Sequence, residues 1–283
     1  MNRRYILAAY LRQQRDLGMP DMVFGQADKV KQSLKSIIAP PQVRPQTGSA
    51  LPEKRPVHTP EHIKNPYGRL SKLAPPVSTV AEPKTSYSAA TFRQKREVFK
   101  ELFTAECDKC ALGKSRTKFV FGAGNVDAPL MIIGEAPGAE EDAQGLPFVG
   151  AAGRLLTELL AGVAIDRKKD VFITNILKCR PPDNRTPDAD EVAACLPLLR
   201  KQIQVIAPRH LLLLGRIAAH ALLGTVDSIG KLRGRVHDYE GIPAIVTYHP
   251  AAILRNPEYR GPTRDDCEKA VKFLKESGQH GTS

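Results

Sequence analysis

Short apolar runs alternate with amphipathic segments from about residue 92 onward. Four of the runs are rich in Leu, Ile, Val or Ala and are bounded by Gly, Pro, Asn or charged residues, a pattern typical of strands buried on both faces. The predicted strands are Leu130–Ile133, Val171–Thr174, His210–Leu214 and Ala244–Thr247.

Apolar residues recur at helical spacing in the segments between these runs and after the last one. The predicted helices are Gly150–Gly162, Pro187–Ile206, Arg216–Leu223 and Thr263–Glu276. Because right-handed crossovers leave few other topologies, this α/β alternation predicts a parallel sheet with helices on both faces. Ligands of such sheets bind at the carboxyl ends of the strands, so the residues that follow each strand deserve inspection first.

The N-terminal third has a different composition. Ten prolines fall between Pro40 and Pro83, with few large apolar residues among them, so this stretch buries too little surface to offset its chain entropy. We therefore expect a short helical segment over residues 1–27, a disordered linker over 28–91 and a folded domain over 92–278. The apolar run Tyr5–Leu11 is too short to cross a membrane and lacks a cleavage pattern, which favours a cytoplasmic protein.

Charge narrows the class of partner. The formal net charge is +12 and the pI is about 9.5, which favours a polyanion, with nucleic acid ahead of an anionic membrane surface. Five cysteines, an odd number, argue against a secreted disulfide framework and for free thiols or a metal centre.

Polar residues follow three of the predicted strands. Glu135 comes soon after the first strand, Asn175 follows the second and His249 follows the fourth. Each alone fits a turn, a helix cap or a solvated loop, but the sheet would bring them to one edge, as in an active site. An acidic cluster at Glu140–Asp142 lies beside the first of them and could hold a water or a cation.

The cysteines form a second constellation. Cys107 and Cys110 make a CxxC turn before the first strand, and Cys179 and Cys195 lie on either side of an Arg-containing loop. Two thiolates from such a turn and two single ones can enclose zinc or an iron–sulfur cluster, although four unrelated buried cysteines are the alternative. Cys267 falls on the last amphipathic helix and is expected to be a small core residue.

Five segments together carry a family resemblance. From about Cys107 to Glu276 the chain resembles the family 4 uracil-DNA glycosylases, the iron–sulfur branch of the uracil glycosylase superfamily. The matching segments are CDKCALGKSRTKFVFGAG, GEAPGAEEDAQGLPFVGAAGRLL, TNILKCRPPDNRTP, GKLRGRVH and TYHPAAILRNP.

The resemblance implies a fold, a cofactor and an activity. The fold is a three-layer αβα arrangement with a four-stranded central parallel sheet. The implied cofactor is a [4Fe-4S] cluster bound by Cys107, Cys110, Cys179 and Cys195. The implied reaction is base excision repair, in which uracil is flipped out of DNA and its N-glycosidic bond is hydrolysed.

The resemblance also assigns roles in the pocket. Phe148 is expected to stack on uracil, Asn175 to read its Watson–Crick edge and His249 to contact O2, with Glu135 and Ala136 lining the same pocket. Ala136 occupies a motif position that is acidic in the best-known uracil glycosylases. The water-activating carboxylate is therefore expected to be Glu135 or, as a second candidate, Glu141.

DNA contacts are expected at three places. After the fourth strand, a wedge loop would fill the vacated base stack with Ile253 and Leu254, beside the phosphate-seeking Arg255. Further phosphate contacts are expected from Lys231, Arg233 and Arg235, with an ordinary solvated basic loop as the alternative. The loop between Cys179 and Cys195 would meet DNA through Arg180 and Arg185.

Other functions stay open at this point. One alternative is a non-catalytic DNA-binding or replication-partner module stapled by a metal. Another is an enzyme that attaches covalently to abasic sites, but no His-bearing basic insertion follows the PFVG segment. We expect a monomer that binds uracil-containing DNA and not a membrane. Its N-terminal arm either docks an unknown protein or is an inert extension.

Overall fold

Two short edge strands and four buried central strands make one mixed sheet of six strands. The computed structural model describes residues 92–103 and 107–279, which all belong to one compact unit of the chain. The strand order is β1-β3-β2-β4-β6-β5. The strands are β1 (Ala123–Gly124), β2 (Leu130–Gly134), β3 (Val171–Asn175), β4 (His210–Leu214), β5 (Val236–Tyr239) and β6 (Ile242–Thr247).

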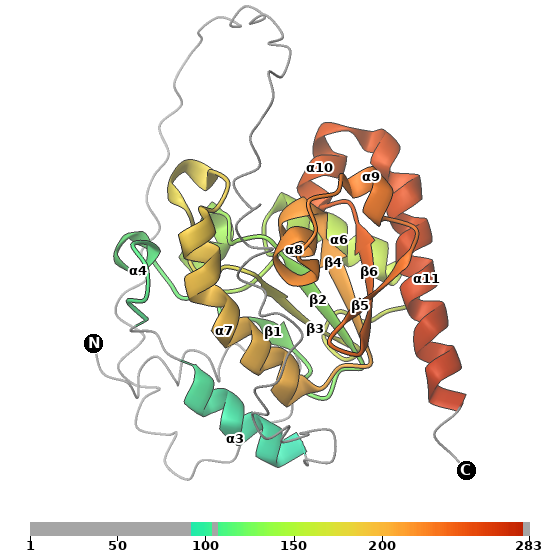
Figure 1. Ribbon diagram of the computed structural model, residues 1–283, viewed down its shortest axis with the longest axis horizontal. Coiled ribbons are helices and arrows are strands. Elements are labelled where there is room, and N and C mark those ends of the chain that lie inside the picture. Colours follow the sequence, from blue (N-terminus) through green and yellow to red (C-terminus); the bar gives the residue numbers. More distant parts are fainter. Residues whose placement is uncertain (1–91, 104–106, 280–283) are drawn as a thin grey trace, which may run out of the picture. The chain divides into compact units, whose positions relative to one another are not determined.

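Helices cover both faces of this sheet (Figure 1). Each central strand alternates its side chains between the two faces, and nearly all of those side chains are buried. One face packs against α3 (Phe92–Leu102), α7 (Ala189–Ile206) and α8 (Gly215–Leu223). The other face packs against α6 (Ala151–Ala161) and α11 (Arg260–Gln279). The result is the three-layer αβα architecture that the sequence predicts.

Several shorter helices connect these larger elements. They are α4 (Leu112–Ser115), α5 (Ala139–Gln144), η3 (Pro182–Asn184), α9 (Ile229–Leu232), α10 (Pro250–Arg255) and η4 (Pro257–Tyr259). Helix α5 begins within a few residues of the carboxyl end of β2, and helix α10 within a few residues of the carboxyl end of β6. They therefore position the loops in which the candidate site residues lie.

The four central strands confirm the predicted parallel sheet. β3, β2, β4 and β6 pair in parallel, and the four predicted helices correspond to α6, α7, α8 and α11. The structure adds two antiparallel edge strands, β1 on β3 and β5 on β6. The expected wedge loop is corrected: most of it is the helix α10, which begins at Pro250 with His249 as its N-cap.

The expectations for residues 1–27 and 28–91 lie outside the described residues. Within the described part of the chain, no helix is both long and apolar enough to cross a bilayer.

Candidate active site

The carboxyl ends of adjacent strands bring three of the predicted pocket residues together. Gly134 ends β2 and Asn175 ends β3, and the two residues are partners in the parallel pairing. Thr247 ends β6, two residues before His249, and β4 lies between β2 and β6. This edge is where ligands bind in α/β sheets.

Asn175 and Phe148 meet over the backbone of Gly134. A Cβ atom added at Gly134 would lie 2.4 Å from Oδ1 of Asn175 and 2.5 Å from Cζ of Phe148, so any larger residue would displace both. Oδ1 of Asn175 is buried and has no hydrogen-bond partner among the described residues. Because an unsatisfied buried acceptor costs about 1–3 kcal/mol, this oxygen indicates a ligand that supplies a donor.

Glu141 positions the loop that carries Phe148. Its carboxylate accepts hydrogen bonds from the backbone N–H of Val149 and Gly150, both at 2.9 Å, and from that of Gly138 at 3.1 Å. The loop holds Phe148 at a φ of 52°, in the left-handed region that non-glycine residues rarely adopt. A carboxylate with three backbone donors is a strong anchor, so Glu141 fixes the aromatic wall of the pocket.

His249 completes the pocket as a neutral hydrogen-bond donor. Its Nδ1 accepts from the backbone N–H of Ala251 at 3.2 Å, so in the neutral ring the proton is on Nε2. Burial lowers the pKa of His249 to about 4, with Arg255 acting in the same direction and Glu141 opposing it. The imidazole is therefore uncharged at neutral pH and presents an N–H group.

A glycine makes room for this histidine. Gly215 follows β4 with a φ of +87°, and a Cβ atom there would lie 2.9 Å from Cβ of His249. The ring of His249 is tilted by 35° to that of Phe148, with the two centroids 5.6 Å apart. The structure thus brings Phe148, Asn175 and His249 close together at the carboxyl edge of the sheet, and their roles in binding a base stay predictions.

Glu135 lies at the same edge, close to two cations. Burial raises the pKa of Glu135, and the charges of Arg216 and Arg255 oppose that rise. No hydrogen bond to the Glu135 carboxylate occurs among the described residues, in contrast to the three donors on Glu141. Its neighbour Ala136 is half-buried and packs against the larger core cluster. Of the two predicted carboxylates, Glu135 is the one available to a water molecule.

The four predicted cluster cysteines lie near one another. Cys179 and Cys195 are buried, Cys107 and Cys110 are half-buried, and all four pack against the same core cluster. Burial raises the pKa of Cys179 to about 11, and the charges of Cys195 and Cys110 add to that rise. Burial likewise raises the pKa of Cys195, which interacts with Cys110 and Cys107. The fifth, Cys267, is buried between α11 and the other face of the sheet, as predicted.

Two cationic side chains adjoin these sulfurs. Arg116 donates from one guanidinium nitrogen to the carbonyl of Cys107 at 2.7 Å and to Sγ of Cys179 at 3.3 Å. Lys178 is fully buried, and its backbone N–H donates to the sulfur of Cys195. Burial lowers the pKa of Lys178 to about 7, while Cys195 and Cys179 act in the opposite direction. Such donors and charges suit a group with a net negative charge.

Four cysteine sulfurs are a donor set used both by tetrahedral zinc and by iron–sulfur clusters. Within residues 92–103 and 107–279, no three His, Cys, Asp or Glu side chains are grouped closely enough to hold one ion. A tetrahedral zinc site would need four sulfurs at about 2.3 Å from one centre. A cubane binds each thiolate to a different iron atom and accepts a wider spacing.

Comparison with known proteins agrees with this geometry. Residues 121–275 match the family described as the Uracil DNA glycosylase superfamily. The chain is 48% identical over 170 residues to a type-4 uracil-DNA glycosylase of Pyrobaculum aerophilum, covering 56% of this chain and 85% of that protein. Type-4 enzymes of Archaeoglobus fulgidus and Thermotoga maritima are 44% and 45% identical, covering 58% and 61% of this chain and 85% and 92% of theirs. The chain belongs to the type-4 uracil-DNA glycosylases.

The matched region of this type-4 glycosylase contains every predicted pocket residue and both Cys179 and Cys195. Cys107 and Cys110 precede the matched region, but they pack against the same core cluster that contains Cys179 and Cys195. The two sites are linked along the chain, because β3 ends at Asn175, four residues before Cys179.

The apolar residues expected to contact DNA divide into one exposed and one buried side chain. Leu254 is 52% exposed, whereas Ile253 is 3% exposed and packs against Leu155 and Leu159 of α6. Ile253 is therefore corrected from a wedge residue to a core residue of the glycosylase. Arg255, at the end of α10, is exposed beside Leu254.

Several predicted phosphate-binding cations form internal contacts. Arg185 makes paired hydrogen bonds to Glu191 at 3.0 and 2.7 Å, and Arg180 donates to Oδ1 of Asn184 at 2.8 Å. Arg233 binds the buried Asp266 at 3.0 Å and the carbonyl of Pro262. Arg233 therefore ties its loop to α11, and its role as a phosphate ligand stays a prediction.

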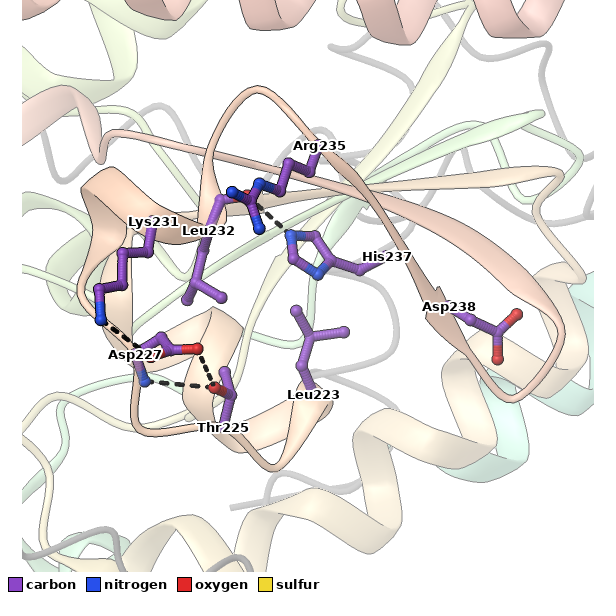
Figure 2. Close-up of a pocket in the computed structure, with 8 residues that line it drawn as sticks. All are labelled: Leu223, Thr225, Asp227, Lys231, Leu232, Arg235, His237 and Asp238. Carbon is purple, nitrogen blue, oxygen red and sulfur yellow. Dashed lines mark hydrogen bonds and ion pairs between the residues drawn. The ribbon is translucent and has the colours of Figure 1, made fainter.

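The other two cations, Lys231 and Arg235, line a separate cavity. Figure 2 shows this cavity of about 470 Å³ between α8, α9 and β5, where Lys231 pairs with Asp227. None of the residues that form the pocket around Asn175 lines it. Its lining residues are Leu223, Thr225, Asp227, Lys231, Leu232, Arg235, His237 and Asp238.

The sequence reasoning missed three residues that adjoin the two sites. Arg216 comes two residues after β4 and acts on Glu135, so inspection of every strand end would have found it. Arg116 and Lys178 lie within the segments that match the family, but their contacts with the cysteine sulfurs depend on the tertiary fold.

Proposed function

We propose that this glycosylase flips uracil out of DNA and hydrolyses its N-glycosidic bond, leaving an abasic site. The observation that carries the proposal is the partnerless Oδ1 of Asn175 beside the ring of Phe148. Uracil supplies an N3–H donor to that oxygen and accepts at O4 from the Asn175 amide nitrogen. Cytosine has a bare N3 and an amino group, so it would leave buried amide atoms unpaired and be rejected.

Flipping needs an aromatic surface inside the pocket and a side chain to fill the vacated stack. Extrusion costs a few kcal/mol, least where a U·G mismatch has already weakened the pair. Stacking on Phe148 offsets part of that cost. Leu254 is the exposed apolar side chain next to the pocket, and with Arg255 on a phosphate it would occupy the gap.

Hydrolysis breaks the bond between N1 of uracil and C1′ of the sugar. Negative charge then develops on uracil O2, and the Nε2–H of His249 stabilises it, lowering the barrier by about 3 kcal/mol. A water oxygen forms the new bond to C1′, and the carboxylate of Glu135 accepts its proton. Glu141 acts indirectly, by holding the Phe148 loop through three backbone hydrogen bonds.

We further propose that Cys107, Cys110, Cys179 and Cys195 hold a [4Fe-4S] cluster. Their convergence, with Arg116 and Lys178 nearby, supports this assignment. When bound, the cluster would supply a covalent tie between the segment before β1 and the loop after β3. That loop includes Arg180 and faces solvent, so the tie would order a DNA-binding surface.

Cleavage of a uracil-containing oligonucleotide tests the activity. The purified protein is incubated with a labelled duplex carrying one U·G pair and then with alkali, which breaks abasic strands. We expect scission at the uracil and none in the matched C·G duplex. Tight DNA binding without scission would instead favour the non-catalytic binding module.

The visible spectrum and iron content of anaerobically purified protein test the cofactor. A [4Fe-4S] protein is brown and contains iron, whereas a zinc-thiolate protein is colourless. For the structural role, we expect a folded Cys179→Ala variant to bind DNA more weakly. Unchanged DNA affinity in that variant would reject the role of the cluster in ordering the loop.

A further inference from the structure

Lys178 lies between the pocket and the four-cysteine site. Its side chain is 0% exposed, and Nζ donates to the backbone carbonyl of Asn175 and to Oγ1 of Thr174, both at 2.6 Å. Thr174 in turn donates to the carbonyl of Phe121 at 2.9 Å. The ammonium group thus fixes the peptide carbonyl of the residue whose side chain faces the pocket.

Anionic sulfur is the available countercharge for this ammonium. Among the described residues no carboxylate forms an ion pair with Lys178, and a buried cation without a countercharge is strongly unfavourable. The sulfurs of Cys195 and Cys179 act on the side-chain charge of Lys178, because they oppose the effect of burial on its pKa. Cys195 also accepts from its backbone N–H. Four thiolates around a [4Fe-4S] core leave a net negative charge, which would compensate the buried cation.

We propose that Lys178 is a positioning residue that couples the four-cysteine site to the uracil-reading amide of Asn175. The inference rests on the proposed function, and it adds to the proposed role of the cluster in ordering the loop after β3. The anionic site holds the ammonium group, and the ammonium group holds the Asn175 carbonyl. Because a peptide plane sets the direction of the attached side chain, this chain of contacts fixes the Asn175 amide.

Two measurable effects follow from removing the ammonium group. The Asn175 amide would lose its anchor, so free uracil would inhibit the enzyme more weakly and discrimination against cytosine would fall. The cluster would also lose a nearby positive charge. Its reduced form, which is more negative, would then be less stable, and the midpoint potential would become more negative.

Lys178→Met and a matched control, Lys95→Met, test the proposal in the cluster-containing protein. Lys95 is also buried, at 6% exposure, and it donates to the carbonyl of Ile206 and pairs with Asp127, away from both sites. We expect the inhibition constant for free uracil to rise about tenfold in Lys178→Met, as for the loss of one charge-assisted hydrogen bond. The midpoint potential should fall in the same variant, and both quantities should stay at the wild-type value in Lys95→Met.

Thr174→Val keeps the test decisive if Lys178→Met does not fold. This variant retains the charge but removes one of the two acceptors of Nζ. We expect a smaller rise in the inhibition constant than tenfold, with an unchanged midpoint potential. A wild-type inhibition constant in Thr174→Val overturns the proposal when it is the variant available.

Failure of the inference differs from failure of the proposed function. A wild-type inhibition constant or a wild-type potential in Lys178→Met overturns the coupling, as do equal changes in Lys95→Met. In each case the unmodified protein still excises uracil. If the unmodified protein neither cleaves uracil-containing DNA nor contains iron, the proposed function fails instead.

Discussion

The ring of His249 lies next to that of Phe148, with the centroids 5.6 Å apart and the planes tilted by 35°. Phe148 supplies an apolar face, and His249 supplies a polar edge with a proton on Nε2. In the proposed complex, uracil stacked on Phe148 would accept at O2 from Nε2 of His249, while its neighbouring N3–H and O4 would meet the amide of Asn175.

His249→Ala should slow uracil excision about 100- to 1000-fold, because it removes the donor to the developing charge on O2. The matched control is His237→Ala, which removes a half-buried histidine bound to the carbonyl of Leu232, outside the pocket. Single-turnover cleavage of a U·G duplex measures both rates. A wild-type rate in His249→Ala would remove that residue from the mechanism.

Acid should inactivate the enzyme through Glu135 before it affects His249. Burial raises the pKa of Glu135 above 4.5, whereas the pKa of His249 is lowered to about 4. A general base acts in its deprotonated form, and kcat/KM reports the ionisable groups of the free enzyme. We therefore expect kcat/KM to fall with decreasing pH, with an apparent pKa above the usual value for a glutamate, while His249 is still neutral. Glu135→Gln should be about 100-fold slower or more, with a flat profile between about pH 8 and pH 5. An acid limb that persists in this variant would assign the titration to another group.

Asn175→Asp should lose most uracil activity and gain weak activity on cytosine. The carboxylate can only accept hydrogen bonds, which suits the amino group of cytosine and repels O4 of uracil. A loss of at least about 100-fold on uracil is expected, because buried polar mismatches are costly. Cleavage of paired U·G and C·G oligonucleotides measures the change. Unaltered preference for uracil would show that Asn175 does not read the base.

The central fold could be predicted from the sequence because the β2, β3, β4 and β6 runs are continuously apolar. The edge strand β5 could not be predicted, because three of its four residues are exposed or half-buried and its composition is that of a loop. β1 has two residues and no detectable period. Helix α10 was mistaken for a loop because six residues are too few to show helical periodicity.

Glu141→Gln should raise KM and destabilise the fold with little loss of the chemical step. It weakens a charge-assisted anchor of three backbone N–H groups, which should cost about 2 kcal/mol of unfolding free energy. Glu140→Gln is the matched control, since Glu140 is exposed and forms a long ion pair with Arg154 at 3.6 Å. Thermal unfolding and the separate values of kcat and KM measure both variants. If kcat fell as far as in Glu135→Gln, Glu141 would be the base.

The candidate site residues could be predicted where a chemically suitable residue type stands at or just after the end of a strand. Glu135, Asn175 and His249 follow strands, and the cysteine spacing indicates a metal centre. The sequence could not distinguish Glu141 as a loop anchor from Glu141 as a base, since the difference is which backbone N–H groups face it. Nor could it show Arg233 bound to Asp266, a contact between segments far apart in the chain.

Leu254→Ala and Ile253→Ala should have different effects, because Leu254 is the proposed wedge and Ile253 is a core residue. Leu254 is exposed, so its truncation should leave the melting temperature unchanged but slow excision from duplex DNA more than from single strands. Ile253 is buried, so Ile253→Ala should lower the unfolding free energy by about 2–5 kcal/mol. Melting curves and rates on both substrates measure the pair. Equal rates for Leu254→Ala and wild type on duplex DNA would exclude the wedge.

The burial of Ile253 determines the orientation of its neighbour. Successive residues of a helix point about 100° apart, so seating Ile253 between α6 and the stacked rings of Tyr248 and Tyr259 turns Leu254 outward. If Leu254 acts as the proposed wedge, it is preorganised before DNA arrives, and little side-chain or loop entropy would be lost when it enters the helix. The rate at which this enzyme searches a duplex for uracil would then depend on how easily each base pair opens, and not on rearrangement of the protein.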